Sequence, residues 1–290
     1  MRTASAFDVR PSLARIGGHH SLRILTAESL KQHRTLFRSR LVIFSLFLWP
    51  ALNLAAMYYA FKPFEAAPGL AERWHLAADW RGIFLFLATG ALGYTFFYSL
   101  VQSAWHFAFE RNQGTLELLF LTPANRLVLV LSNGAMSLAQ NAWLFLAFVV
   151  GLFVLVGRLE LAHPAMVLVA FAGLLVPAVA WGTFLNSLFL FSRDAGFLYT
   201  IFQDPMEFFA GTRIPLFALP GWAQIIGVVF PLTSSLLVLR GSLLEGRTLT
   251  DLWAELLLLA ALSAVLLLAS AFLLRMGEAR AKRSGSLVLF

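Results

Sequence analysis

The chain has 290 residues, of which 59% are hydrophobic and only 13% are charged, and its mean hydropathy is +0.77. Soluble domains contain about 45–50% apolar residues, so this composition excludes an ordinary soluble domain and predicts an integral membrane protein. The net charge is +7, which the gathering of Lys and Arg at the cytoplasmic flanks of membrane spans explains without nucleic-acid binding. The chain has no cysteine and only scattered histidines, so we expect neither disulfides nor a metal site.

Residues 1–40 are expected to lie in the cytoplasm, because they are mostly polar and hold eight Lys or Arg residues. Such a polar leader also argues against a cleavable signal peptide. In residues 21–40, basic residues gather on one side of a helical projection and apolar residues on another, namely Leu22, Leu25, Leu30, Leu36 and Phe37. We expect an amphipathic helix in the membrane surface. The alternative is a charged leader that only sets the topology.

Five stretches are long and apolar enough to cross a membrane as helices of about 20 residues: 41–61, 82–105, 127–156, 165–191 and 252–274. The tail at 275–290 is again basic, which places both termini in the cytoplasm and requires an even number of crossings. The remaining apolar region, 197–239, is broken by Pro215 and Pro231. We therefore expect one span over 197–212, followed by a re-entrant hairpin over 213–240 whose two halves are divided at Pro231.

These elements together predict an all-α membrane protein. Its parts are a cytoplasmic N-terminus with an interfacial helix (1–40), a six-span domain (41–274) and a cytoplasmic tail (275–290). The expected location is a cytoplasmic, inner-type membrane, which the chain crosses several times.

The loop over residues 106–126, between the second and third spans, carries a short amphipathic pattern. Gly114 separates a polar half from an apolar half, Thr115 is a suitable N-cap, and Glu117 lies where the helix dipole favours an acid. One apolar face and a helix stop follow, from Leu116, Leu119, Phe120 and Pro123. A helix of this kind suits docking into a groove of a partner protein. On the residues alone, a connecting loop that lies on the bilayer is an equal alternative.

No nucleotide-hydrolysis site is legible in the sequence. A P-loop needs a lysine that follows a glycine, and none of the three lysines, Lys31, Lys62 and Lys282, does so. No nucleophile elbow or Ser-His-Asp arrangement is visible either. We expect a chain that is not itself an enzyme and that binds no cofactor.

Three charged residues, Asp204, Glu207 and Arg213, lie in or beside the broken apolar region. Ionisable groups inside a span are costly and often mark a transport pathway. The other interpretation is structural: Glu207 pairs with Arg213 or caps a half-helix near the membrane edge. Some aromatic residues are candidates for lining a conduit, among them Phe44, Phe47, Phe96, Phe97, Phe202 and Phe208.

The run ERNQGTLELLFLTP resembles the coupling-loop signature of type-2 ABC transporter permeases. The match is carried by Glu110, Arg111, Gly114, Thr115, Leu116, Glu117, Leu119, Thr122 and Pro123. A second run is similar to the closing pattern of that family, through Pro205, Gly211, Pro215, Leu219, Pro220, Trp222, Pro231, Leu232, Thr233 and Arg240. Together with the interfacial helix and the six-span count, the resemblance covers residues from about 21 to the C-terminus.

The resemblance implies the permease subunit of an ABC exporter. It implies pairing as a homodimer, or as a heterodimer with a similar chain, above two separate ATPase subunits that bind ATP and Mg²⁺. The coupling helix around Gly114 would dock on those subunits, and the cargo would be a drug-like molecule or a lipid-linked saccharide. The rival from another class is an ATP-independent secondary carrier or a membrane scaffold. A carrier should show an internal repeat and a midplane carboxylate; we find no repeat, and Asp204 and Glu207 are the candidate carboxylates.

Overall fold

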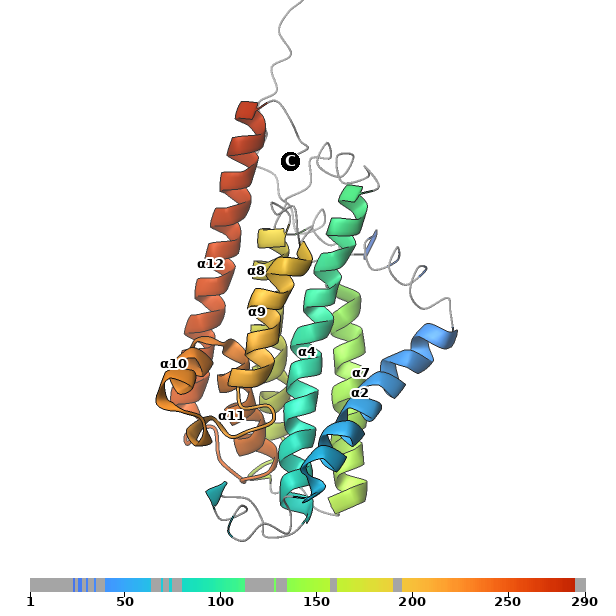
Figure 1. Ribbon diagram of the computed structural model, residues 1–290, viewed down its shortest axis with the longest axis vertical. Coiled ribbons are helices and arrows are strands. Elements are labelled where there is room, and N and C mark those ends of the chain that lie inside the picture. Colours follow the sequence, from blue (N-terminus) through green and yellow to red (C-terminus); the bar gives the residue numbers. More distant parts are fainter. Residues whose placement is uncertain are drawn as a thin grey trace, which may run out of the picture.

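The computed structural model describes residues 40–63, 80–112, 135–156, 161–189 and 195–284, with a few single positions elsewhere. These residues form eight α-helices and a short 3-10 helix, and no strand occurs among them (Figure 1). The elements are α2 (Arg40–Phe61), α4 (Trp80–Asn112), α7 (Ala135–Val156), α8 (Met166–Phe189), α9 (Ala195–Phe209), η2 (Leu216–Ala218), α10 (Gly221–Val229), α11 (Pro231–Leu243) and α12 (Trp253–Ser284).

Several of these helices suit a membrane. Among the described residues, three stretches are long and apolar enough to cross it, namely Arg81–Val101, Met166–Leu188 and Trp253–Met276. The pair α10 and α11 would make a fourth crossing if the two helices formed one span. The prediction of an all-α membrane protein is therefore confirmed in this coarse form.

Helix α8 holds the bundle together, because it packs against α4, α11 and α12. Leu174 and Leu185 of α8 are fully buried in the main core, together with Leu236 of α11. Phe96 and Phe97 of α4 are also fully buried there, so these two side chains are core residues and do not line a conduit.

Glycines permit three close contacts, two with a backbone carbonyl group and one with a side chain. A Cβ at Gly90 of α4 would overlap the carbonyl oxygen of Thr212, and one at Gly227 of α10 would overlap that of Phe209. At Gly173 of α8, a Cβ would lie 2.8 Å from a methyl group of Val238. Small residues of this kind are what helix packing in a membrane uses, since lipid offers no hydrophobic drive for association.

The bend between α10 and α11 follows from Pro231. The two helices meet at 88°. Phe230 is extended, with φ −79° and ψ 128°, as steric conflict with the ring of a following proline requires. Pro231 then occupies the first turn of α11, where its missing N–H costs nothing. The predicted break at Pro231 is confirmed, and α11 extends to Leu243, three residues beyond the predicted hairpin.

Polar side chains join α7 to α4. Asn141 is buried, and its Oδ1 accepts a hydrogen bond from the Ser99 hydroxyl at 2.8 Å. Its Nδ2 donates to the carbonyl oxygen of Phe96 at 3.3 Å. A polar pair inside an apolar bundle fixes the register of the two helices, because slippage would leave both groups unsatisfied.

Helix α4 is longer than the second predicted span. It continues to Asn112, so Glu110 and Arg111 belong to its final turn and not to a loop. The remaining residues of the coupling motif lie outside the described residues, namely Gly114, Thr115, Leu116, Glu117, Leu119, Phe120, Thr122 and Pro123. Most of the predicted interfacial helix over 21–40 lies outside them too.

Replacing Gly90 with Ala should destabilise the bundle, because the added methyl group would overlap the Thr212 carbonyl and force α4 away from its neighbour. Overpacking of this kind costs about 1–3 kcal/mol. Gly151→Ala is the matched control: nothing lies within 4 Å of a Cβ there, so the substitution should be neutral or stabilising by up to about 1 kcal/mol. Thermal unfolding of both variants in the same nanodiscs measures the difference. Equal midpoints would contradict the close contact at Gly90.

Candidate functional site

The segment after α9 is shaped by the glycine and prolines of the second motif. Gly211 has φ +82°, a left-handed conformation that glycine adopts without strain, and it ends α9. Pro215 precedes η2 and Pro220 precedes α10, each as the N-cap residue. Pro205 lies inside α9 itself. The motif therefore sets where helices begin and end.

Two further motif residues hold this segment in place. The hydroxyl of Thr233 donates to the carbonyl oxygen of Gly227, which closes the corner between α10 and α11. Trp222 is 62% exposed and packs edge-on against Phe209 at a ring distance of 5.8 Å. The side-chain amide of Gln224 donates to the carbonyl oxygen of Leu219 at 2.8 Å. The two hydrogen bonds add side-chain donors to backbone carbonyls at the ends of the broken helices.

Glu207 and Arg213 form an ion pair, as the structural interpretation of the sequence predicted. The Thr212 hydroxyl donates to the backbone carbonyl oxygen of Glu207, and the guanidinium of Arg213 lies 5.6 Å from the ring centre of Phe208. The pair bridges the end of α9 and the turn formed by residues 210–215, which we call the post-α9 turn. Asp204 lies one turn earlier on α9 and is half-buried.

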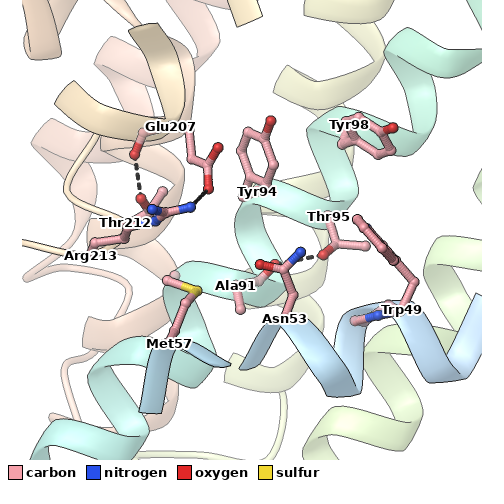
Figure 2. Close-up of a pocket in the computed structure, with 12 residues that line it drawn as sticks. Trp49, Asn53, Met57, Ala91, Tyr94, Thr95, Tyr98, Glu207, Thr212 and Arg213 are labelled. Atoms are coloured by element: carbon pink, nitrogen blue, oxygen red, sulfur yellow. Dashed lines mark hydrogen bonds and ion pairs between the residues drawn. The ribbon is translucent and has the colours of Figure 1, made fainter. Parts of the chain in front are cut away.

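A cavity of about 210 Å³ lies between α2, α4 and the post-α9 turn (Figure 2). Figure 2 shows Glu207, Thr212 and Arg213 on one side, with side chains of α4 and α2 facing them. We call this cavity the α2–α4–α9 pocket. Its lining consists of Trp49, Pro50, Asn53, Met57, Gly90, Ala91, Tyr94, Thr95, Tyr98, Glu207, Thr212 and Arg213.

The pocket lies beside the middle of a candidate membrane span. Gly90, which touches Thr212, is close to the middle of the apolar stretch Arg81–Val101. Irregular backbone such as the post-α9 turn is tolerated at that depth only where protein or an aqueous cavity covers it. Polar and ionisable side chains there are expensive, and they mark functional sites by default.

Arg240 fastens three elements together beside this pocket. Its Nε donates to the hydroxyl of Thr89 on α4 at 3.0 Å, and one terminal nitrogen donates to the carbonyl oxygens of Phe86 at 3.1 Å and Gly211 at 3.0 Å. The guanidinium also lies 3.9 Å from the ring centre of Phe86. Arg240 belongs to α11, so this one side chain connects α11, α4 and the post-α9 turn. We call this set of contacts the Arg240 clasp.

A second arginine orders the connection between α11 and α12. Arg247 forms an ion pair with Glu255 at 2.9 Å and donates to the carbonyl oxygen of Asp251 at 2.7 Å. The hydroxyl and the backbone N–H of Thr248 both donate to the Asp251 carboxylate, and they hold the pKa of that group below its ordinary value.

Sequence reasoning missed the partners of Arg240 and most of the pocket lining. Thr89, Phe86, Tyr94 and Tyr98 carry no motif signal, and they reach the site only because α4 packs against the post-α9 turn. One signal was available: residues 88–93 are mostly small, a composition typical of close contacts between helices. Asn53 of α2 is also part of the pocket wall.

Comparison of the sequence with protein-family models and with curated proteins finds no match to either. The argument for function therefore rests on the residues and geometry described above. Among the described residues, no group of three or more His, Asp or Glu side chains is placed to hold a metal ion.

Replacing Arg240 with Met should destabilise the protein by about 2–4 kcal/mol, because hydrogen bonds from a charged group are worth roughly 1.5–3 kcal/mol each and three are lost, while a charge is no longer buried. Arg240→Lys should rescue little, since an ammonium cannot span the three acceptors as a guanidinium does. Arg247→Met is the matched control and should cost at most about 1 kcal/mol, as a partly exposed pair does. Thermal unfolding in nanodiscs ranks the three variants. Similar losses for the Arg240 and Arg247 variants would refute the role of the clasp.

Proposed function

We propose that the chain is the permease subunit of an ATP-driven ABC exporter, which moves an amphipathic or hydrophobic cargo out of the cytoplasm or the inner leaflet. The cargo class is a drug-like molecule or a lipid-linked saccharide. ATP and Mg²⁺ belong to a separate ATPase subunit, and the permease pairs as a homodimer or with a similar chain. The resemblance of two motifs to type-2 ABC permeases supports this proposal, and so does the place of the first motif in the fold.

The position of the coupling motif at the end of α4 carries the proposal. With 33 residues, α4 is about 50 Å long, whereas the hydrocarbon core is about 30 Å thick. Its apolar stretch ends at Val101, so the last eleven residues extend about 16 Å further, and they carry Glu110 and Arg111. In Figure 1, α4 and α12 end on the same side of the bundle. The basic tail of α12 favours the cytoplasm, which puts the motif where an ATPase would bind.

Six crossings fit this arrangement, with both termini in the cytoplasm. Helices α2, α4, α7, α8 and α12 take five of them. Helix α9 has 15 residues and is about 22 Å long, so in this topology it ends inside the membrane. The chain then returns to the outer side through the α10–α11 hairpin. The contact of the post-α9 turn with Gly90 supports this depth.

The proposed mechanism uses the two ends of α4. Closure of the ATPase subunits on ATP would push on the coupling segment after Asn112 and on the interfacial helix over 21–40. Because α4 is one continuous helix from Trp80 to Asn112, a displacement at its cytoplasmic end would be transmitted to Gly90 and so to the pocket.

An ATP-independent carrier, or a membrane scaffold, is the second candidate. Glu207 favours a carrier, because it is a carboxylate in the wall of a pocket at membrane depth. Transport by vesicles that hold the chain with no ATPase subunit would favour this alternative. Stimulation of a co-purified ATPase by cargo would favour the exporter.

The coupling motif should hold the ATPase subunit. Burying each apolar anchor in a partner groove is worth roughly 1.5–3 kcal/mol. Leu119→Ser with Phe120→Ser should therefore weaken binding of the ATPase by about two to four powers of ten. Co-purification from membranes measures the loss, while size-exclusion chromatography checks that the membrane-inserted dimer survives. If the variant retains the ATPase and exports normally, the segment only connects two spans and the prediction is wrong.

Gly114→Pro should separate ATP hydrolysis from transport. It restricts the backbone between the two halves of the motif without removing an apolar anchor, so the ATPase should stay bound and active while export falls. Paired measurements of ATP turnover and vesicle uptake test this. Full export by the variant would contradict the role of the segment as a mechanical link.

The α10–α11 hairpin should be reachable only from the outer side. The chain has no cysteine, so single cysteines report position cleanly. Gly221 and Thr250 suit the test because both are exposed, whereas Gly241 is buried against Leu252 and Arg247. An impermeant thiol reagent should label both cysteines from outside in intact cells. Labelling from the cytoplasmic side alone would overturn the six-span topology.

A further inference from the structure

The α2–α4–α9 pocket holds an acid and a base that already satisfy one another. Glu207 and Arg213 are in direct contact, and both line the cavity. The rest of the lining is uncharged, and it includes aromatic and polar side chains such as Trp49, Tyr94 and Asn53. The pocket therefore has strong hydrogen-bonding groups but no net charge of its own.

The size of the pocket limits what enters it. Its cavity volume is about 210 Å³. Sites that enclose whole drug-sized ligands occupy roughly 300–1,000 Å³. This pocket accommodates one ring-sized group, and the remainder of a larger molecule stays outside it.

We infer that the α2–α4–α9 pocket receives an uncharged, ring-sized polar group of the cargo, and that the Glu207–Arg213 pair sets this charge selectivity. The inference rests on the proposed transport function, since it names the class of cargo group that this pocket accepts. An uncharged group can add hydrogen bonds without separating the ion pair. The guanidinium has five N–H donors and the carboxylate about four lone-pair sites, so both retain capacity after pairing.

A charged group gains little attraction in this pocket and loses its hydration. A cation that approaches Glu207 also meets Arg213, and an anion that approaches Arg213 also meets Glu207. At membrane depth, either ion would lose its hydration while the pair cancels most of the attraction it gains. Removing one member of the pair should leave a single charge and admit ions of the opposite sign.

Three probes with the same hexyl tail test the inference: hexyl glucoside (uncharged), hexyltrimethylammonium (a cation) and hexyl phosphate (an anion). Equilibrium dialysis measures their binding to the purified full-length chain in nanodiscs, with empty nanodiscs subtracted. The wild-type protein should bind the glucoside about tenfold or more tightly than either ion, because the lost hydration of an ion, which the pair does not repay, exceeds the free energy of one power of ten. If the wild-type protein binds either ion as tightly as the glucoside, the inference is wrong. This measurement does not depend on whether a variant folds.

Variants then assign the selectivity to the pair. Glu207→Gln should raise affinity for the anion, and Arg213→Gln should raise affinity for the cation, each by about tenfold. The double variant should lose both gains in ion affinity, because the pocket is then neutral again and the selectivity comes from the balance of the two charges. Asp204→Asn is the matched control, because it removes a carboxylate from the same helix but not from the pocket lining; it should leave the ranking unchanged. Equal shifts for all three probes, or a switch caused by Asp204→Asn, would refute the role of the pair.

A cysteine at position 53 locates the bound probe. Asn53 lines the pocket, and the chain has no other cysteine. The glucoside should slow maleimide labelling of Asn53→Cys and leave labelling of Thr250→Cys unchanged; equal protection at both positions would place the probe elsewhere. These measurements need no ATPase. Failure of the wild-type chain to co-purify with an ATPase subunit would thus overturn the exporter and leave the charge selectivity standing. Equal binding of the three probes by the wild-type chain would overturn the charge selectivity and leave the exporter standing.

Discussion

Satisfying backbone polar groups at membrane depth is the constraint on which the rest of the structure depends. Helix α9 ends beside the middle of the apolar stretch of α4, where an unpaired carbonyl costs several kcal/mol. Side chains donate to the carbonyls there: the Thr212 hydroxyl donates to that of Glu207, and the Arg240 guanidinium donates to that of Gly211. The broken segment therefore persists as an ordered wall inside the bundle.

That ordered wall makes a pocket possible. Gly90 lets the post-α9 turn approach α4 without a side chain between them, and the Arg240 clasp fixes their separation. The Glu207–Arg213 pair then faces α2 across a cavity in place of lipid. Because α4 carries both Gly90 and the start of the coupling motif, the same rigid helix joins the pocket to the proposed ATPase site. Coupling between two sites needs a physical element of this kind.

Short-range features of this site were predictable because local chemistry decides them. Pro231 and the residue before it cannot continue a helix, so the bend between α10 and α11 followed from the sequence. Glu207 and Arg213 are six residues apart across a turn, which brings them within reach. The clasp was not predictable, because Thr89 and Phe86 lie 151 and 154 residues from Arg240 along the chain. The end of α4 was placed too early for another reason: hydropathy marks where apolar residues stop, whereas helical hydrogen bonds continue to Asn112.

The sequence by itself determined that the protein suits a membrane, that it is helical and where its helices are interrupted. Composition, apolar length and proline decide these features locally, without a partner elsewhere in the chain. Only the tertiary structure decided where the interrupted segment lies and what it contacts. The approach of the post-α9 turn to Gly90, and the cavity beside it, depend on how α2 and α4 pack against a segment more than a hundred residues away. For Glu207, the sequence shows only a charged residue in an apolar region. Its place in the wall of a pocket that α2 and α4 also line arises from packing, because those helices are distant in the sequence.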